Sequence, residues 1–213
     1  MATSNDRNLI CYLSWGRREY VEQTFIPLVE NMRPQDRLLV FDQDGFNADF
    51  YLKYKDKIDY LFLTKHNYFI GGAWTLFRQI AQWLIEIKEM SGWYPDYINI
   101  LESDALIQRG DWIDRLLECF DIEGQKISAV TGYLGDRDPN EKIIRVIGDK
   151  YIKNGIHGIS MICHVEDFLK IYNYPKFTQD AYFTERIRPK GRIACRFIIK
   201  HIGDQRRKAG FFL

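Results

Sequence analysis

The feature that most constrains this chain is an alternation of short apolar runs with longer segments of helical periodicity. Runs too short for a helix lie at residues 8–13, 37–41, 60–63 and 97–101. Segments with apolar residues at helical spacing lie at 18–31, where Pro27 is expected to interrupt the helix, and at 73–90 and 111–120. Since parallel strands require long crossover connections that are usually helices, this alternation predicts βαβ units and a mostly parallel sheet.

The pattern changes after residue 127. Short β-like runs follow at 128–131, 143–147, 159–163 and 193–199, separated by turns rich in Gly, Pro and Asp. We therefore predict an α/β fold with a mixed C-terminal half. The 213 residues, 46% of them hydrophobic, are enough for one well-packed domain over 1–213, with halves at about 1–126 and 127–213.

The composition favours a soluble, cytoplasmic protein. The sequence has no apolar run of 18 residues, and its first residues lack the apolar core of a signal peptide. Cys11, Cys119, Cys163 and Cys195 are widely spaced and mostly lie within apolar segments, so we expect reduced core thiols rather than disulfides or a zinc site.

The charge is unevenly distributed along the chain. Residues 186–208 carry nine Lys or Arg and one acid, whereas the rest of the chain has 21 basic and 28 acidic residues. This basic C-terminal segment indicates contact with an anion, such as nucleotide phosphates, a nucleic acid or an anionic lipid surface. A merely solvated basic tail is the alternative.

Two acids follow the apolar run at 97–101. Glu102 and Asp104, separated by Ser103, stand where a buried strand emerges at the edge of the sheet. Ligands in α/β folds usually bind at the carboxyl ends of the strands. These residues therefore form either a ligand site or a solvated acidic turn.

The ends of the first two strands carry further candidates. Ser14 and Trp15 directly follow the first strand and precede a helix, a place that faces the ligand in nucleotide-binding sheets. The sequence has no Gly-x-Gly-x-x-Gly and no Walker A lysine there. Asp42 ends the second strand, where it either bonds a ribose or base or serves as a turn residue.

The remaining candidates lie further along the chain. Asn67 with Gly71 and Gly72 precedes the long helix, where paired glycines allow either close approach to a ligand or a tight turn. Asp180 is either a functional acid or the N-cap of a helix at 181–187. His201 is either a metal ligand or a structural histidine.

One chemistry would use these residues together. Glu102, Asp104 and His201 form an oxygen and nitrogen set suited to Mg²⁺ or Mn²⁺ bridging a pyrophosphate. Asp180 would take a proton from an acceptor hydroxyl, and nearby basic residues would stabilise developing charge. Sugar transfer from a nucleotide sugar requires these functions.

The ordered motifs resemble those of GT-A glycosyltransferases, and most closely the family 2-like group. Residues 9–15 are similar to the family's first strand and nucleotide-contacting loop, and Asp42 stands where its base-contacting carboxylate lies. Asn67 with Gly71 and Gly72 resembles the segment before the family's long helix. The stretch 98–105, followed by Gly110-Asp111-Trp112, is similar to its DxD segment.

The resemblance continues to the end of the chain. Gln179-Asp180 resembles the family's Glu-Asp pair, Arg186 and Gly191 follow as in the family, and His201-Ile202-Gly203 resembles its late metal-binding histidine. Glu102 and Gln179 replace the first acid of their respective motifs.

The resemblance implies a nucleotide-sugar-binding half followed by an acceptor and catalytic half. It also implies a nucleoside-diphosphate sugar donor, UDP-sugar favoured, and a divalent metal, Mn²⁺ or Mg²⁺, on Asp104, Glu102 and His201. Asp180 would be the base of an inverting hexosyl transfer. The donor would be held by residues of the strand-end loops: Ser14, Trp15, Asp42, Asn67, Gly71, Gly72 and Ser103.

The acceptor and two competing functions stay open. The basic segment suits an anionic acceptor, such as a hydroxylated base in DNA or a surface glycan. A sugar nucleotidyltransferase would also use paired acids, although the chain has no Gly-rich, Lys- or Arg-bearing loop after its first strand. The non-enzymatic alternative is a nucleotide- or nucleic-acid-binding module.

Overall fold

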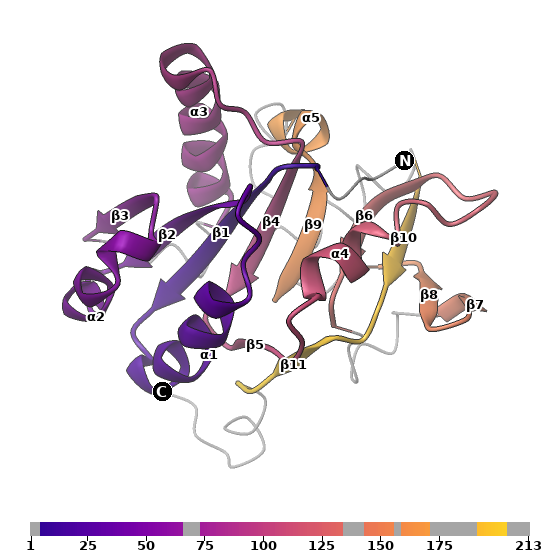
Figure 1. Cartoon of the computed structure of the whole chain (residues 1–213), viewed down its shortest axis with the longest axis horizontal. Helices are drawn as coiled ribbons and strands as arrows, with labels where there is room; N and C mark the ends of the chain where they lie inside the picture. Colours follow the sequence, from indigo (N-terminus) through magenta and orange to yellow (C-terminus); the bar gives the residue numbers. More distant parts are fainter. Residues whose placement is uncertain (1–4, 66–72, 134–142, 156–158, 171–190, 204–213) are drawn as a thin grey trace.

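The computed structural model describes residues 5–65, 73–133, 143–155, 159–170 and 191–203 (Figure 1). It contains a nine-stranded sheet in the order β3-β2-β1-β4-β9-β6-β10-β8-β7, and a separate two-stranded sheet of β11 and β5. The strands of the large sheet are β1 (Asn8–Trp15), β2 (Arg37–Gln43), β3 (Tyr60–Thr64), β4 (Tyr97–Glu102), β6 (Ile127–Thr131), β7 (Ile143–Ile147), β8 (Lys150–Lys153), β9 (Ser160–His164) and β10 (Arg192–Cys195). The small sheet joins β5 (Ala105–Ile107) to β11 (Ile199–His201).

The α/β prediction is confirmed. Strands β3, β2, β1 and β4 are parallel, whereas β9 is antiparallel to both β4 and β6, and β8 is antiparallel to β10 and β7. A parallel first half therefore continues into a mixed second half. Helices connect the parallel strands because such strands need long crossovers.

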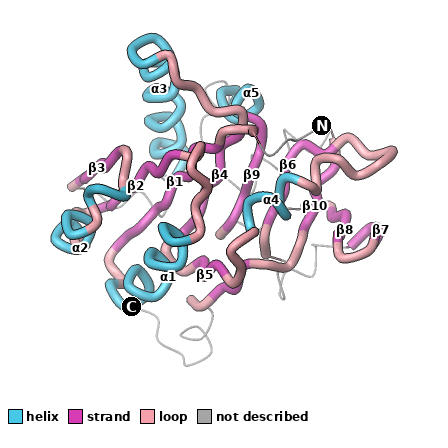
Figure 2. The backbone as a smooth tube through the Cα atoms, viewed as in Figure 1, coloured by secondary structure: helices cyan, strands magenta, loops and turns pink. Residues whose placement is uncertain are grey.

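Helices cover both faces of the large sheet (Figure 2). The core on one face combines sheet residues with residues of α1 (Arg18–Glu30), α2 (Ala48–Lys53) and α4 (Trp112–Leu117). The core on the other face is built with α3 (Ala73–Ser91) and α5 (Val165–Phe168). Short turns, including the 3-10 helix η1 (Lys55–Lys57), complete the described connections. In the described part of the chain, no helix is both long and apolar enough to cross a membrane.

Several element boundaries differ from the sequence predictions. The run at 193–199 is divided between two strands, β10 and β11. After β10 ends, the N–H groups of Ile198 and Ile199 donate to the Gly132 carbonyl oxygen, and β11 then pairs with β5. Helix α1 continues through Pro27, since Phe25 and Leu28 on either side of it are buried against the sheet. Elements α2, β5 and β8 were not predicted. The predicted helix at 181–187 lies outside the described residues.

The buried cysteines agree with the expectation of reduced core thiols. All four are free and buried. Burial raises the pKa of the Cys119 thiol to about 12, and raises those of Cys11 and Cys163 well above the usual range. A thiolate is therefore disfavoured at these positions, which opposes both metal binding and oxidation.

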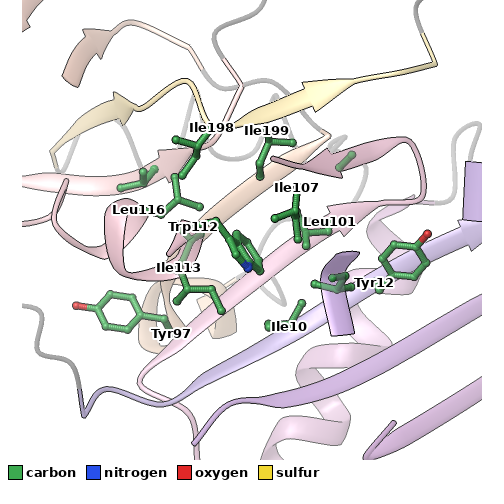
Figure 3. Packing of buried hydrophobic residues seen from close by; sticks show 14 of the residues in the cluster. Ile10, Tyr12, Tyr97, Leu101, Ile107, Trp112, Ile113, Leu116, Ile198 and Ile199 are labelled. Carbon is green, nitrogen blue, oxygen red and sulfur yellow. The ribbon is translucent and has the colours of Figure 1, made fainter. Parts of the chain in front are cut away.

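Trp112 anchors the α4 side of the core. It is 0% exposed and lies among Leu101, Ile107 and Ile113 (Figure 3). Its indole Nε1 donates a hydrogen bond of 3.1 Å to the carbonyl oxygen of Asn31, which follows α1. One side chain thus links α4 to the end of α1.

We expect Trp112→Ala to destabilise the protein by about 3–5 kcal/mol, because it removes a fully buried aromatic side chain and leaves a cavity. The free energy of unfolding in urea measures this loss. Met90→Ala is the matched control, since Met90 is 83% exposed on α3. Equal effects of the two substitutions would contradict the packing described for Trp112.

Candidate functional site

The register of the parallel strands brings the predicted strand-end residues to one edge of the sheet. Ser14 of β1 is paired with Asp42 of β2, and Leu13 of β1 is paired with Glu102 of β4. In Figure 1 the carboxyl end of β4 points toward the small sheet of β5 and β11, and β1 lies beside β4 in parallel. This edge is where α/β sheets usually bind ligands.

Asp42 is held inside this edge by hydrogen bonds. Its Oδ1 accepts from Ser14 Oγ at 2.8 Å and from Asn47 Nδ2 at 3.2 Å, while Oδ2 accepts from the Asn47 backbone N–H at 2.9 Å. The Asn47 amide also donates to the Gly16 carbonyl oxygen at 2.9 Å. Asp42 is 0% exposed, and burial raises the pKa of its carboxyl.

The network around Asp42 therefore fixes the loop after β1 to the loop after β2. These hydrogen bonds explain the positions of the Ser14 and Asp42 side chains without a ligand. Contact of Asp42 with a nucleoside therefore stays a prediction. Trp15 lies at the partly exposed end of β1.

Asp104 and His201 meet through the pairing of β5 with β11. His201 is in register with Ala105, and the Ile202 N–H donates to the Asp104 carbonyl oxygen at 3.0 Å. This pairing places His201 Nε2 3.1 Å from Asp104 Oδ2. Asp104 is 4% exposed, so the two side chains form a buried pair from positions 97 residues apart.

Gly203 leaves the space that this pair requires. A Cβ atom at position 203 would overlap Asp104 Oδ2 and lie 3.0 Å from His201 Nε2. Gly203 does not have a positive φ, so its role is close approach to the two side chains rather than backbone conformation. The motif His201-Ile202-Gly203 thus has a steric basis.

The turn between the two acids is anchored from helix α1. Thr24 Oγ1 lies 2.8 Å from the Ser103 carbonyl oxygen and shares a 2.6 Å hydrogen bond with the Tyr12 hydroxyl. These contacts are buried, and burial raises the pKa of Tyr12 above its usual range. Ser103 therefore helps to fix the position of Asp104 through its backbone.

Glu102 is arranged differently from Asp104. It ends β4, its side chain is partly buried, and its backbone N–H donates to Ile159 at 3.0 Å. Within the described ranges, no group of three or more His, Cys, Asp or Glu side chains is arranged to hold a metal ion. The structure thus brings together Asp104 and His201 of the predicted set, without Glu102.

The Asp104–His201 pair fits a divalent ion that also binds phosphate. Asp104 Oδ1 is buried, and no described residue hydrogen-bonds to it. A buried carboxylate oxygen normally has a partner, and a metal ion would satisfy it. Mg²⁺ is commonly held by one or two carboxylates together with substrate phosphates and water, and carboxylate and water ligands also suit Mn²⁺.

Several predicted residues lie outside the described part of the chain. They are Asn67, Gly71, Gly72, Gln179, Asp180 and Arg186. Gly191 is described, and a Cβ there would overlap Ser128 Oγ and lie 2.6 Å from the Lys126 carbonyl oxygen. This glycine therefore has a packing requirement of its own.

The basic C-terminal segment is only partly described. Arg192 and Lys200 are exposed. Arg196 is 7% exposed, and its guanidinium forms ion pairs with Glu118 and with Asp149, the latter at 2.7 Å. Arg196 thus stabilises the contact between α4, the β7–β8 turn and β10, and does not face an external anion.

Sequence analysis missed Arg17, Thr24 and Asn47. Arg17 Nη1 lies 3.3 Å from Asp104 Oδ2. Asp44-Gly45 is a typical turn sequence, but nothing in the sequence indicates that Asn47, two residues later, bonds both Asp42 and Gly16. Such contacts depend on side chains that meet only after the sheet has formed.

No known protein-family model and no curated protein sequence matches this chain. Solved structures match its fold. The mannosyltransferase PcManGT from Pyrobaculum calidifontis, in complex with GDP-Man and Mn²⁺, is 12% identical with a TM-score of 0.62, over 92% of this chain and 58% of its own. S. aureus TarS 1-349 in complex with UDP-GlcNAc is 12% identical with a TM-score of 0.60, over 92% of this chain and 60% of its own.

A third structure matches over nearly its whole length. The nucleoside-diphosphate-sugar pyrophosphorylase from Vibrio cholerae RC9 is 12% identical with a TM-score of 0.56, over 94% of this chain and 98% of its own. The chain spans less than two thirds of the length of the PcManGT and TarS structures. At these identities the similarity shows the fold, which is GT-A-like, with glycosyltransferases among its structural neighbours.

We expect Gly203→Ala to destabilise the protein by about 1–3 kcal/mol, because the added methyl group must displace Asp104 or His201. Urea unfolding measures the loss, and the ¹⁵N chemical shift of the His201 ring reports any change in its contact with Asp104. Lys200→Ala, at an exposed position of β11, is the control. An unchanged stability together with an unchanged His201 shift would contradict the close packing of Gly203.

Proposed function

We propose that this chain is a glycosyltransferase that moves a sugar from a nucleoside-diphosphate sugar, UDP-sugar favoured, to an acceptor hydroxyl. The observation that carries the proposal is the buried Asp104 carboxylate. Its Oδ1 has no described hydrogen-bond partner, and its Oδ2 lies 3.1 Å from His201 Nε2. The carboxylate lies at the edge of the sheet where the parallel strands β1 and β4 end. A divalent ion shared with a diphosphate would satisfy this arrangement.

In the proposed site, Asp104 and His201 would hold Mn²⁺ or Mg²⁺. The bound metal would neutralise charge on the diphosphate leaving group. Glu102, which ends β4 two residues before Asp104, would be a secondary ligand of the same metal. The donor is held by the strand-end loops, through Ser14, Trp15, Asp42, Asn67, Gly71, Gly72 and Ser103.

The proposed base is Asp180. Its carboxylate would accept the proton from the acceptor hydroxyl, which attacks the anomeric carbon as the bond to the diphosphate breaks on the opposite side. This displacement inverts the anomeric centre. The proposal for Asp180 rests on its sequence motif alone.

The structural neighbours support a nucleotide-sugar donor. PcManGT was solved with GDP-Man and Mn²⁺, and TarS with UDP-GlcNAc. We place the donor half at about 1–126 and the acceptor half at about 127–213 of a single domain. The exposed Arg192 and Lys200 suit an anionic acceptor, such as a nucleic acid with hydroxylated bases or a surface glycan.

A sugar nucleotidyltransferase is the second candidate, favoured by one observation. The Vibrio cholerae pyrophosphorylase matches this chain over 98% of its length, so no large part of that fold lacks a counterpart here. The two reactions differ in their products. Incubation with UDP-sugar should release UDP if the chain is a glycosyltransferase, whereas incubation with UTP and a sugar phosphate should release pyrophosphate if it is a nucleotidyltransferase.

We expect UDP or a UDP-sugar with Mn²⁺ to raise the melting temperature, because a ligand that binds only the native state stabilises it. The gain is about 2.7 kcal/mol at a ligand concentration 100 times the dissociation constant. EDTA and Asp104→Asn should each abolish the Mn²⁺-dependent part of the shift. Asp56→Asn, which changes an exposed acid of η1, should preserve it. A shift that is unaffected by EDTA and by Asp104→Asn would refute the proposed metal site.

We expect Asp180→Asn to lower transfer by about 10²–10⁴-fold, since an amide cannot accept the proton of the acceptor hydroxyl. Donor affinity should stay nearly unchanged. The comparison requires turnover and donor binding to be measured on the same variant. Glu166→Gln, at an exposed position of α5, is the control. Near-normal turnover by Asp180→Asn would remove Asp180 from the mechanism.

A further inference from the structure

A cationic side chain already occupies one side of the proposed metal site. Arg17 Nη1 lies 3.3 Å from Asp104 Oδ2, the same oxygen that lies 3.1 Å from His201 Nε2. The Asp104 side chain is buried, whereas the Arg17 side chain is 38% exposed. Arg17 is therefore accessible from solvent while it pairs with a buried acid.

The local structure directs Arg17 toward this acid. Arg17 precedes α1 in the left-handed conformation, with φ 45° and ψ 50°, and its carbonyl oxygen accepts from the Tyr20 N–H at 2.9 Å. This conformation is uncommon for a residue other than glycine. The guanidinium also lies 6.0 Å from the Trp15 ring centre and 5.8 Å from that of Tyr20. Two aromatic rings and one carboxylate thus hold it at the donor edge.

The negative charge of Asp104 explains why the Arg17 guanidinium lies beside it. A buried carboxylate is costly without a compensating charge, and among the described residues Arg17 supplies a permanent one. A divalent ion at Asp104 would bring a second positive centre within a few ångströms of the guanidinium. Solvent screens part of this repulsion, because the Arg17 side chain is 38% exposed, and the part that remains disfavours Arg17 and the metal at Asp104 together.

We propose that Arg17 competes with the divalent ion for Asp104 and, once released, binds the donor's diphosphate. This inference rests on the proposed function. In the free protein Arg17 neutralises Asp104. When metal and nucleoside diphosphate bind, the guanidinium turns from Asp104 toward the diphosphate oxygens. Its planar set of donors can bind these oxygens in a bidentate manner.

The competition is tested by Mn²⁺ titration of the full chain without nucleotide, with binding followed by water-proton relaxation. We expect Arg17→Gln to bind Mn²⁺ about tenfold more tightly than the unmodified chain, because the competing charge is gone. Asp104→Asn should lose binding. Arg18→Gln is the control, since Arg18 pairs with Glu22 and Asp49, each at 2.8 Å, and not with Asp104.

The second step is tested by the affinity for UDP at saturating Mn²⁺. We expect Arg17→Gln to bind UDP about tenfold more weakly, through the loss of a charge-assisted contact, and Arg17→Lys to recover part of the affinity. Opposite effects of one substitution on Mn²⁺ and on UDP are the signature of the proposal. A residue that merely tethers the loop would weaken both.

The outcomes separate this inference from the proposed function. Mn²⁺ affinity that is unchanged or lower in Arg17→Gln, or undetectable in both proteins, would overturn the competition. Unchanged UDP affinity would overturn the diphosphate contact. The proposed function would instead be refuted if the unmodified chain bound no nucleoside diphosphate and no nucleotide sugar with Mn²⁺. The Mn²⁺ titration contains no nucleotide, so it would still decide whether Arg17 competes with the metal.

Discussion

The structure depends on the position of β1 between β2 and β4. Leu9, Ile10 and Cys11 of β1 are fully buried, and the strand pairs in parallel with a neighbour on each side. Because the three strands run in the same direction, their carboxyl ends meet at one edge. The same register that builds the core therefore sets Asp42 and the Glu102–Asp104 turn near the loop after β1.

The two buried acids at this edge are compensated in different ways. Asp42 is surrounded by neutral donors from Ser14 and Asn47, which use both of its oxygens. Asp104 instead faces Arg17 and His201 through Oδ2 and keeps Oδ1 without a described partner. Both Asp42 oxygens thus already accept hydrogen bonds from the protein, whereas Asp104 retains an oxygen that can bind a metal. This contrast decides which acid we assign to the metal.

Periodicity and residue type predicted the parallel sheet and most of its strands, because burial imposes a regular pattern on each segment separately. They also placed Asp42, Glu102 and Asp104 at strand ends. They could not predict that, among the described residues, Glu102 does not join Asp104 and His201 in a cluster of three metal-binding side chains, since the position of His201 depends on β11 pairing with β5. They also missed Arg17 and Asn47, whose contacts join distant segments. The roles of Asn67, Gly71, Gly72 and Asp180 stay predictions.

The proposed metal site is tested most directly by a crystal structure of the protein with UDP and Mn²⁺, in which anomalous scattering locates the metal. We expect an anomalous peak within coordination distance of the Asp104 carboxylate and of His201 Nε2, next to the diphosphate at the carboxyl ends of β1 and β4. A nucleotide bound elsewhere, or bound at this edge with no metal beside Asp104, would contradict the proposed site.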